Sequence, residues 1–152
     1  MNLNGNSIKK MPPQNLEAER ALLGACLLDN EAANTVKGII SPSDFYSESH
    51  RLIYECIARL TDEAQPCDAV TVSDALKVNG DLERIGGIAY ISGLLDSVPA
   101  PASAAYYANI IREKAQTRAL IDAASRILAE SYEGGYSANE LQDIAEKVIF
   151  DV

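Results

Sequence analysis

The stretch SAAYYANIIREKAQTRALIDAASRILAESY, residues 103–132, decides the fold of this 152-residue chain. It contains neither proline nor glycine, the two residues least compatible with a helix interior. A continuous helix of about 30 residues would be about 45 Å long, whereas the average helix of a globular domain has about 12 residues. We therefore expect one helix here that is long for a small domain.

Apolar side chains repeat along this stretch at alternating intervals of three and four, with Lys114 at one position of the repeat. The repeat comprises Tyr107, Ile110, Thr117, Ile121, Ala124 and Leu128, and Leu120 and Ile127 widen it. Gly134 and Gly135 end the pattern, and Ser137 and Glu140 then have the spacing of a capping box for a second helix. The C-terminal third is therefore predicted to be a helical hairpin.

Two helices alone cover only part of such apolar faces, and excess apolar surface is typical of an association site. Two-fold pairing of hairpins into a four-helix bundle would bury it. The expected pairing surface consists of Tyr107, Ile110, Ile111, Leu120, Ile121, Leu128, Leu141 and Val148.

Shorter helices are predicted upstream of the proline-rich break at residues 98–101. Their expected first residues or caps are Asn15, Asn30, Ser41, Asp68 and Gly86–Gly87. Between them, Leu52, Ile53, Cys56, Ile57 and Leu60 share one helix face, with His50, Arg51, Glu55 and Arg59 expected on the solvent side. A strand at residues 70–72 is the alternative to a helix after Asp68.

The predicted fold class is therefore all-α, a globular multi-helix subdomain followed by a long helical hairpin. We expect residues 1–14 to be a flexible lead-in, residues 15–101 to form the globular subdomain and residues 102–152 to form the hairpin.

Charge and motifs exclude several function classes. The net charge is −9, from 22 acidic and 13 basic residues, which disfavours a direct grip on nucleic acid. Arg112, Lys114 and Arg118 alternate with Glu113 and are expected to form a salt-bridged surface or interface rim. The sequence has no GxxxxGK[ST], GxGxxG or HExxH motif, and no pair of carboxylates stands out as catalytic. We expect no catalytic, cofactor or metal site here.

The three cysteines, Cys26, Cys56 and Cys67, lack metal-ligand spacing. The first two fall among apolar helical residues, where a thiol acts as a small apolar side chain. A reducing cytoplasm is the expected compartment, and no apolar run approaches the ~20 residues that span a bilayer.

Five segments together resemble the N-terminal domain of DnaB-type replicative DNA helicases. They are PPQNLEAE (12–19) with LLG (22–24) and LDN (28–30), DFY (44–46), HRLIY (50–54), GGIAYI (86–91) and YYANIIREKA (106–115). The resemblance covers residues 12–152 in the family's order and spacing.

This resemblance implies a collar domain that assembles subunits and docks partners. In the family a long helical hairpin protrudes from the globular part, and the hairpins pair. Six copies form a trimer of dimers above a hexameric motor ring, and a DnaG-type primase docks on the collar. A helicase loader is a further possible partner. The resemblance also implies that the chain is part of a longer helicase, whose motor uses ATP and magnesium to unwind DNA. This part is expected to bind no nucleotide and no membrane.

By resemblance, Glu17, Tyr90, Ile121 and Ile127 are the expected primase or partner contacts. For each of them a purely structural role stays open: helix-end charge for Glu17, core packing for Tyr90, and hairpin packing for the two isoleucines. The alternative functions are the helicase-binding C-terminal domain of a primase, a stand-alone replication adaptor with this fold, and a small hydrolase dependent on His50.

Overall fold

A computed structural model describes residues 11–152, which are all helix, turn and loop without a strand. The all-α prediction is confirmed. Most of the lead-in predicted to be flexible, residues 1–10, lies outside the described residues. The elements are α1 (Leu16–Leu28), α2 (Asn30–Val36), the 3-10 turn η1 (Pro42–Asp44), α3 (Glu48–Asp62), α4 (Ala69–Val78), α5 (Gly87–Leu95), the 3-10 turn η2 (Pro101–Ser103), α6 (Ala104–Glu133) and α7 (Ala138–Phe150).

Local capping explains most of the helix starts. The Asn15 side chain accepts a hydrogen bond from the Ala18 amide at the start of α1. Reciprocal capping boxes start α4, between Asp68 and Thr71, and α7, between Ser137 and Glu140. The alternative of a strand at residues 70–72 is wrong, because these residues form the first turn of α4.

Two predicted helix starts need correction. Asp29, not Asn30, caps α2 by accepting from the Glu31 amide, and the Asn30 side chain instead accepts from the Cys67 amide at 3.3 Å. The SPSD segment at residues 41–44 has its capping box but forms only one 3-10 turn. The next α-helix starts at Glu48, capped by Ser47, whose side chain accepts from the His50 amide.

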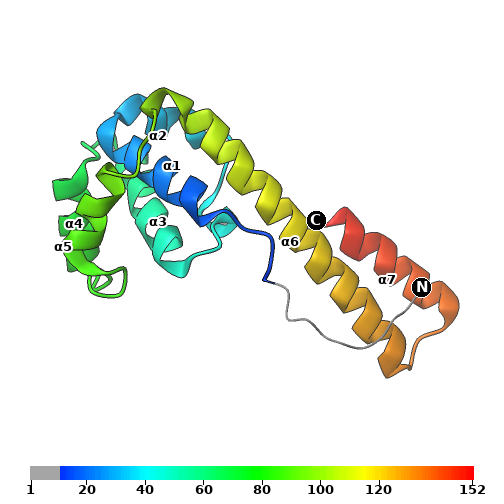
Figure 1. Ribbon diagram of the computed structural model, residues 1–152. Coiled ribbons are helices and arrows are strands. Elements are labelled where there is room, and N and C mark those ends of the chain that lie inside the picture. The colour runs from blue at the N-terminus through cyan, green and yellow to red at the C-terminus, as the bar shows by residue number, and fades with distance from the viewer. Residues whose placement is uncertain (1–10) are drawn as a thin grey trace.

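Helix α1 is at the centre of the globular part, packed against α2, α3, α5 and α6 (Figure 1). Leu22, Leu23 and Cys26 have no exposed surface. Gly24 lets α5 approach closely, because a Cβ atom at that position would lie 2.2 Å from the Leu94 carbonyl oxygen. The largest aromatic side chains of this core, Phe45 and Tyr54, have ring centroids 4.9 Å apart.

Helix α6 belongs to both parts of the molecule. Its 30 residues confirm the predicted long helix, and Gly134, with a φ of 75°, follows its end. Ala104, Ala108 and Ile111 in its first turns belong to the globular core, whereas its distal half projects outward and packs against α7 (Figure 1). The packing boundary therefore lies within α6 rather than between residues 101 and 102.

Candidate functional site

An uncharged apolar stripe follows the outer side of the distal half of α6. Leu120, Ile121 and Leu128 are 51%, 46% and 59% exposed. Thr117 and Ala124, which continue the three-four repeat between them, are also exposed. The part of the repeat from Thr117 to Leu128 therefore faces solvent, as an unpaired helix seam does.

The opposite side of the distal half of α6 forms the inside of the hairpin. Ala123 is buried and Ile127 is half-buried there, while α7 contributes the buried Val148 and the half-buried residues Leu141, Ile144 and Ala145. The hairpin thus uses its own apolar seam for α7 and leaves the stripe uncovered.

Part of the predicted pairing surface is covered within the chain. Ile111 is 2% exposed and lies in the globular core, so its assignment to the pairing surface is corrected. Tyr107 and Ile110 pack partly against the same core, and Val148 is buried in the hairpin. The reason is that α6 is long enough for its first turns to serve the core. Leu120, Ile121 and Leu128 remain available, with Leu141 half-buried.

A buried polar chain joins three helices in the globular part. Nδ1 of His50 on α3 lies 2.8 Å from Oε1 of Glu19 on α1, and Nε2 of His50 lies 2.5 Å from Oη of Tyr90 on α5. The His50 and Glu19 side chains are both 2% exposed. The Glu19 carboxylate also accepts from the amides of Tyr46, at 2.9 Å, and Ser47, at 3.3 Å. Because a carboxylate oxygen can only accept a hydrogen bond, Nδ1 of His50 carries the proton and donates the hydrogen bond to Glu19.

Tyr90 ends this chain near the surface, where its side chain is half-buried. Burial raises the pKa of its hydroxyl, and the adjacent Arg20 guanidinium opposes that rise. The close packing of the Tyr90 side chain on Gly86, whose φ is 107°, shows why glycine precedes α5. Tyr90 is thereby fixed from both sides.

The prediction that His50 lies on the solvent side of α3 is wrong. His50 is three, seven and ten residues before Ile53, Ile57 and Leu60, which places it on the buried face. Glu19 is three, four and seven residues before Leu22, Leu23 and Cys26, which places it on the buried face of α1. An ionisable residue on the apolar face of each helix, His50 on α3 and Glu19 on α1, was the signal in the sequence that could have predicted this buried pair, since a buried charge needs a partner.

Arg118 connects the long helix to two distant segments. Its Nη1 donates to the Pro13 carbonyl at 2.7 Å and its Nη2 to the Asp44 carbonyl at 2.6 Å. Its guanidinium carbon lies 5.6 Å from the centroid of the Tyr46 ring. The predicted salt-bridged surface is therefore wrong for Arg118, whose partners are backbone carbonyls and an aromatic face.

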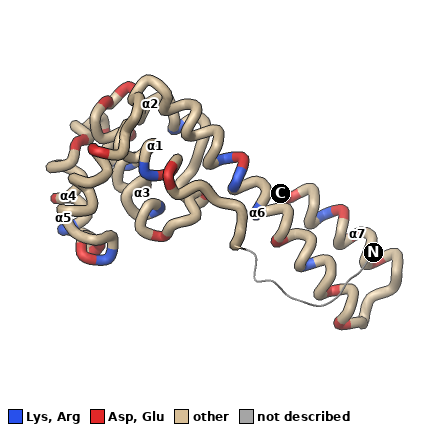
Figure 2. Tube along the Cα trace, in the orientation of Figure 1, with Lys and Arg blue, Asp and Glu red and all other residues tan. Residues whose placement is uncertain are grey.

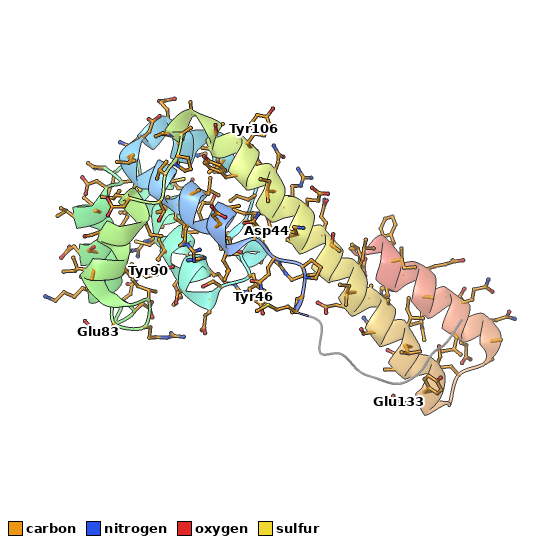
Figure 3. All side chains as sticks on the ribbon, in the orientation of Figure 1. Asp44, Tyr46, Glu83, Tyr90, Tyr106 and Glu133 are labelled. Carbon is orange, nitrogen blue, oxygen red and sulfur yellow. The ribbon has the colours of Figure 1, made fainter. Side chains whose placement is uncertain are left out.

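A groove of about 840 Å³ surrounds this contact. Its wall on α6 runs from Ala115 to Asp122 and includes Ile121 of the apolar stripe, and its other wall is formed by residues 11–13, 43–46 and Arg51. Figure 3 places Tyr46 and Asp44 at this junction between the globular part and the hairpin.

A family model described as DnaB-like helicase N terminal domain matches residues 11–113. The chain belongs to this family. The replicative DNA helicase DnaB of Geobacillus stearothermophilus is 40% identical over 144 residues, which are 95% of this chain and 32% of that protein. The DnaB of Treponema pallidum is 39% identical over 143 residues, or 94% of this chain and 33% of that protein. The chain thus spans about a third of the length of these relatives.

Solved structures share the fold of this DnaB-like domain. The crystal structure of the N-terminal domain of DnaB helicase from Mycobacterium tuberculosis superposes with a TM-score of 0.87 at 40% identity, covering 93% of this chain and all of that one. The N-terminal domain from Helicobacter pylori, described with its interactions with primase, has a TM-score of 0.63 at 21% identity over 76% of this chain and 90% of that one. The second likeness shows the fold alone.

The four predicted partner contacts of this DnaB-like domain come from two parts of the molecule. Glu17 is exposed on the first turn of α1, and Tyr90 lies on α5 in the globular part. Ile121 is exposed on the hairpin, and Ile127 is half-buried within it. Figure 3 shows Tyr90 in the globular part, far from Glu133 at the hairpin tip.

Cys26, Cys56 and Cys67 are buried free thiols, as small apolar side chains would be. Burial raises the pKa of Cys26 and of Cys67 from 9.0 to about 12. Within residues 11–152, no helix is long and apolar enough to cross a membrane, and no three side chains are grouped as a metal-binding set.

Proposed function

We propose that this chain is the N-terminal collar domain of a hexameric replicative DNA helicase, in which it pairs subunits and docks a primase. The observation that carries the proposal is the uncovered stripe of Leu120, Ile121 and Leu128 on a hairpin that projects from the globular part. A second copy presenting the same stripe would bury both, as isologous two-fold interfaces do. Three such pairs would form the collar.

Charge supports an apolar rather than an ionic pairing surface. The chain carries a net charge of −9, and acidic residues occur along both parts of the molecule (Figure 2). The stripe itself contains no charged side chain between Thr117 and Leu128 along its repeat. Two copies therefore gain by burying apolar area along this part of the repeat.

Sedimentation velocity tests the pairing. We expect a dimer for the unaltered chain and a monomer for Leu128→Glu, because a carboxylate in the seam would lose its hydration without a partner. The matched control is Val78→Glu, since Val78 is 79% exposed on α4 and away from the hairpin. A Leu128→Glu variant that dimerises as well as the control would contradict the proposed surface.

Primase docking is the second half of the proposal, with Glu17, Tyr90, Ile121 and Ile127 as contacts. The exposure of Glu17 and Ile121 supports it, and the half-buried Tyr90 also reaches the surface. Titration calorimetry with the C-terminal domain of a DnaG-type primase tests it. We expect weaker binding for Glu17→Ala and for Ile121→Ala, and unchanged binding for Val78→Ala. A helicase loader is a further partner to test in the same way.

ATP and magnesium are assigned to the longer protein, where they would drive unwinding. This chain lacks the GxxxxGK[ST] loop that would cradle the phosphates of ATP. The relatives named replicative DNA helicase are about three times as long as this chain. We prefer the hypothesis of a helicase domain to those of a primase domain or an adaptor, because these helicase relatives align with 94% or more of the chain. The proposed location is the cytoplasm, where free thiols persist.

A further inference from the structure

The hairpin leaves the globular part beyond Ile111, the last residue of α6 that belongs to the core cluster. Arg118 lies two turns further along the same helix and contacts the globular part again. Helix α6 also packs against η1, and Arg118 adds two hydrogen bonds to this junction, to the carbonyls of Pro13 and Asp44. Arg118 is therefore placed where its side chain can fix the direction of the hairpin.

The contacts of Arg118 suit that purpose. Its planar guanidinium donates to the carbonyls of Pro13, before α1, and Asp44, at the end of η1, and it faces the Tyr46 ring. One side chain thus joins three segments. The planar guanidinium donates to the two carbonyls from separate nitrogens while its face lies over an aromatic ring, whereas methionine has no donor and the ammonium of lysine has no planar face.

The segment that Arg118 holds also belongs to the buried polar chain. Tyr46 contributes its ring to Arg118 and its amide to the Glu19 carboxylate, and the Ser47 amide binds the same carboxylate. Glu19 in turn binds His50, which binds the Tyr90 hydroxyl. Continuous hydrogen bonds and one cation–π contact therefore connect Tyr90 on α5 to Arg118 on α6.

We propose that Arg118 is a positioning residue for the hairpin and that the loop Asp44–Ser47 couples it to Tyr90. A partner that binds the Tyr90 hydroxyl would then weaken or strengthen the contacts by which Arg118 holds the hairpin, and the hairpin is the element that pairs subunits. The effect of a partner on subunit pairing rests on the proposed function, whereas the coupling between Tyr90 and Arg118 is a property of a single chain. The coupling can therefore be tested independently of primase binding.

The first arm of the experiment measures the direction of the hairpin. Spin labels are attached at Asp74→Cys on α4 and at Asn139→Cys on α7, and pulsed electron paramagnetic resonance measures the distance between them. Excess unlabelled chain is present so that only distances within one chain are measured. The native thiols are buried, so the added cysteines react selectively. We expect a broader distance distribution for Arg118→Met. Arg126→Met, which loses only an exposed ion pair with Glu130 on the same helix, should leave the distribution unchanged.

The second arm measures the coupling through the loop. Tyr90→Phe removes one hydroxyl and keeps the ring, so the fold is retained. We expect it to speed hydrogen exchange at the Tyr46 and Ser47 amides by about threefold or more and to broaden the hairpin distribution. Tyr106→Phe, at a side chain that is 77% exposed, is the control and should change neither.

Each outcome decides one part of the proposal. An unchanged hairpin distribution in Arg118→Met overturns the positioning role. Wild-type amide exchange and an unchanged distribution in Tyr90→Phe overturn the coupling, even where Arg118→Met behaves as expected. Non-additive broadening in the Arg118→Met, Tyr90→Phe double variant supports a shared network. If both measurements give the expected results but the unaltered chain does not bind primase, only the proposed function is contradicted.

Discussion

Gly24 is the residue at which two helices of the core come closest. A Cβ atom there would lie 2.2 Å from the Leu94 carbonyl oxygen and 2.3 Å from a methyl carbon of Val98. No rotation of a methyl group relieves a clash with backbone, so α1 and α5 would have to separate. The sequence pattern of α1 could not show this, because a helical glycine reads only as a weak helix former.

We expect Gly24→Ala to lower the free energy of unfolding by about 2 kcal/mol or more, the typical cost of overpacking a dense core. Urea unfolding followed by circular dichroism measures it. Gly93→Ala on α5 is the matched control, because nothing lies within 4 Å of its added Cβ atom. That control should be as stable as the unaltered chain or slightly more so. Equal midpoints for the two variants would disprove the close approach.

The buried thiols make stability depend on alkaline pH. Burial holds the pKa of Cys26 and Cys67 at about 12 in the folded chain, against 9.0 for a free thiol. Their contribution is fully present below pH 9, where both states keep the proton, and it is lost as pH rises from 9 towards 12. We expect the urea midpoint to fall over that window and to fall less steeply in a Cys26→Ala, Cys67→Ala variant.

Tyr54 complicates that measurement and supplies its control. Burial also raises the pKa of the Tyr54 hydroxyl above its ordinary value of 10.0, so it adds to the loss of stability at the upper end of the window. A Tyr54→Phe background removes this contribution. In that background, a midpoint that stays constant from pH 8 to pH 11 would rule out the thiols as the cause.

His50 and Asn30 show which single residues could be predicted. The helical spacing of His50 places it on the buried face of α3, yet a histidine is polar and was therefore expected at the surface. Asn30 and Asp29 are both good caps, and only the contact of Asn30 with the distant Cys67 amide decides between them. A tertiary contact of that kind leaves no local sequence signal.

At the level of helices, capping chemistry made most boundaries predictable because it acts within four residues. The Ser137–Glu140 box and the glycines after α6 define the turn of the hairpin from sequence alone. The share of α6 that enters the core was not predictable. Its three-four repeat runs from Tyr107 to Leu128, interrupted only by Lys114, and it has the same spacing where it faces the core and where it faces solvent.

Helix α7 should depend strongly on its cap, since Val148 is its one buried residue and is still 9% exposed. We expect Ser137→Ala to cost about 1 kcal/mol of local stability and to speed amide exchange in the first turns of α7. Exchange in α1 should not change. Ser125→Ala, an exposed position within α6, is the control. Uniform acceleration across the molecule would instead mean that the hairpin and the core unfold together.

For the whole molecule, the join between hairpin and globular part was the feature least visible in the sequence. Arg118 binds the carbonyls of Pro13 and Asp44, which are 105 and 74 residues away. Backbone carbonyls carry no residue identity, so no pairing of side-chain types could indicate these contacts. The resemblance to a known family supplied the projecting hairpin, and the geometry of its attachment came only from the structure.

Salt dependence distinguishes the forces that pair two whole chains. Each copy carries a net charge of −9, so two copies repel one another over about 10 Å at 0.1 M salt, and higher salt screens that repulsion. The stripe that would pair them is apolar and gains nothing from low salt. We therefore expect the dimer dissociation constant, measured by sedimentation, to fall as sodium chloride rises from 50 to 500 mM. Val78→Glu should show the same trend with a slightly larger slope, because it adds a negative charge to each copy. A dissociation constant that rises with salt would mean that ion pairs, not Leu120, Ile121 and Leu128, hold the two chains together.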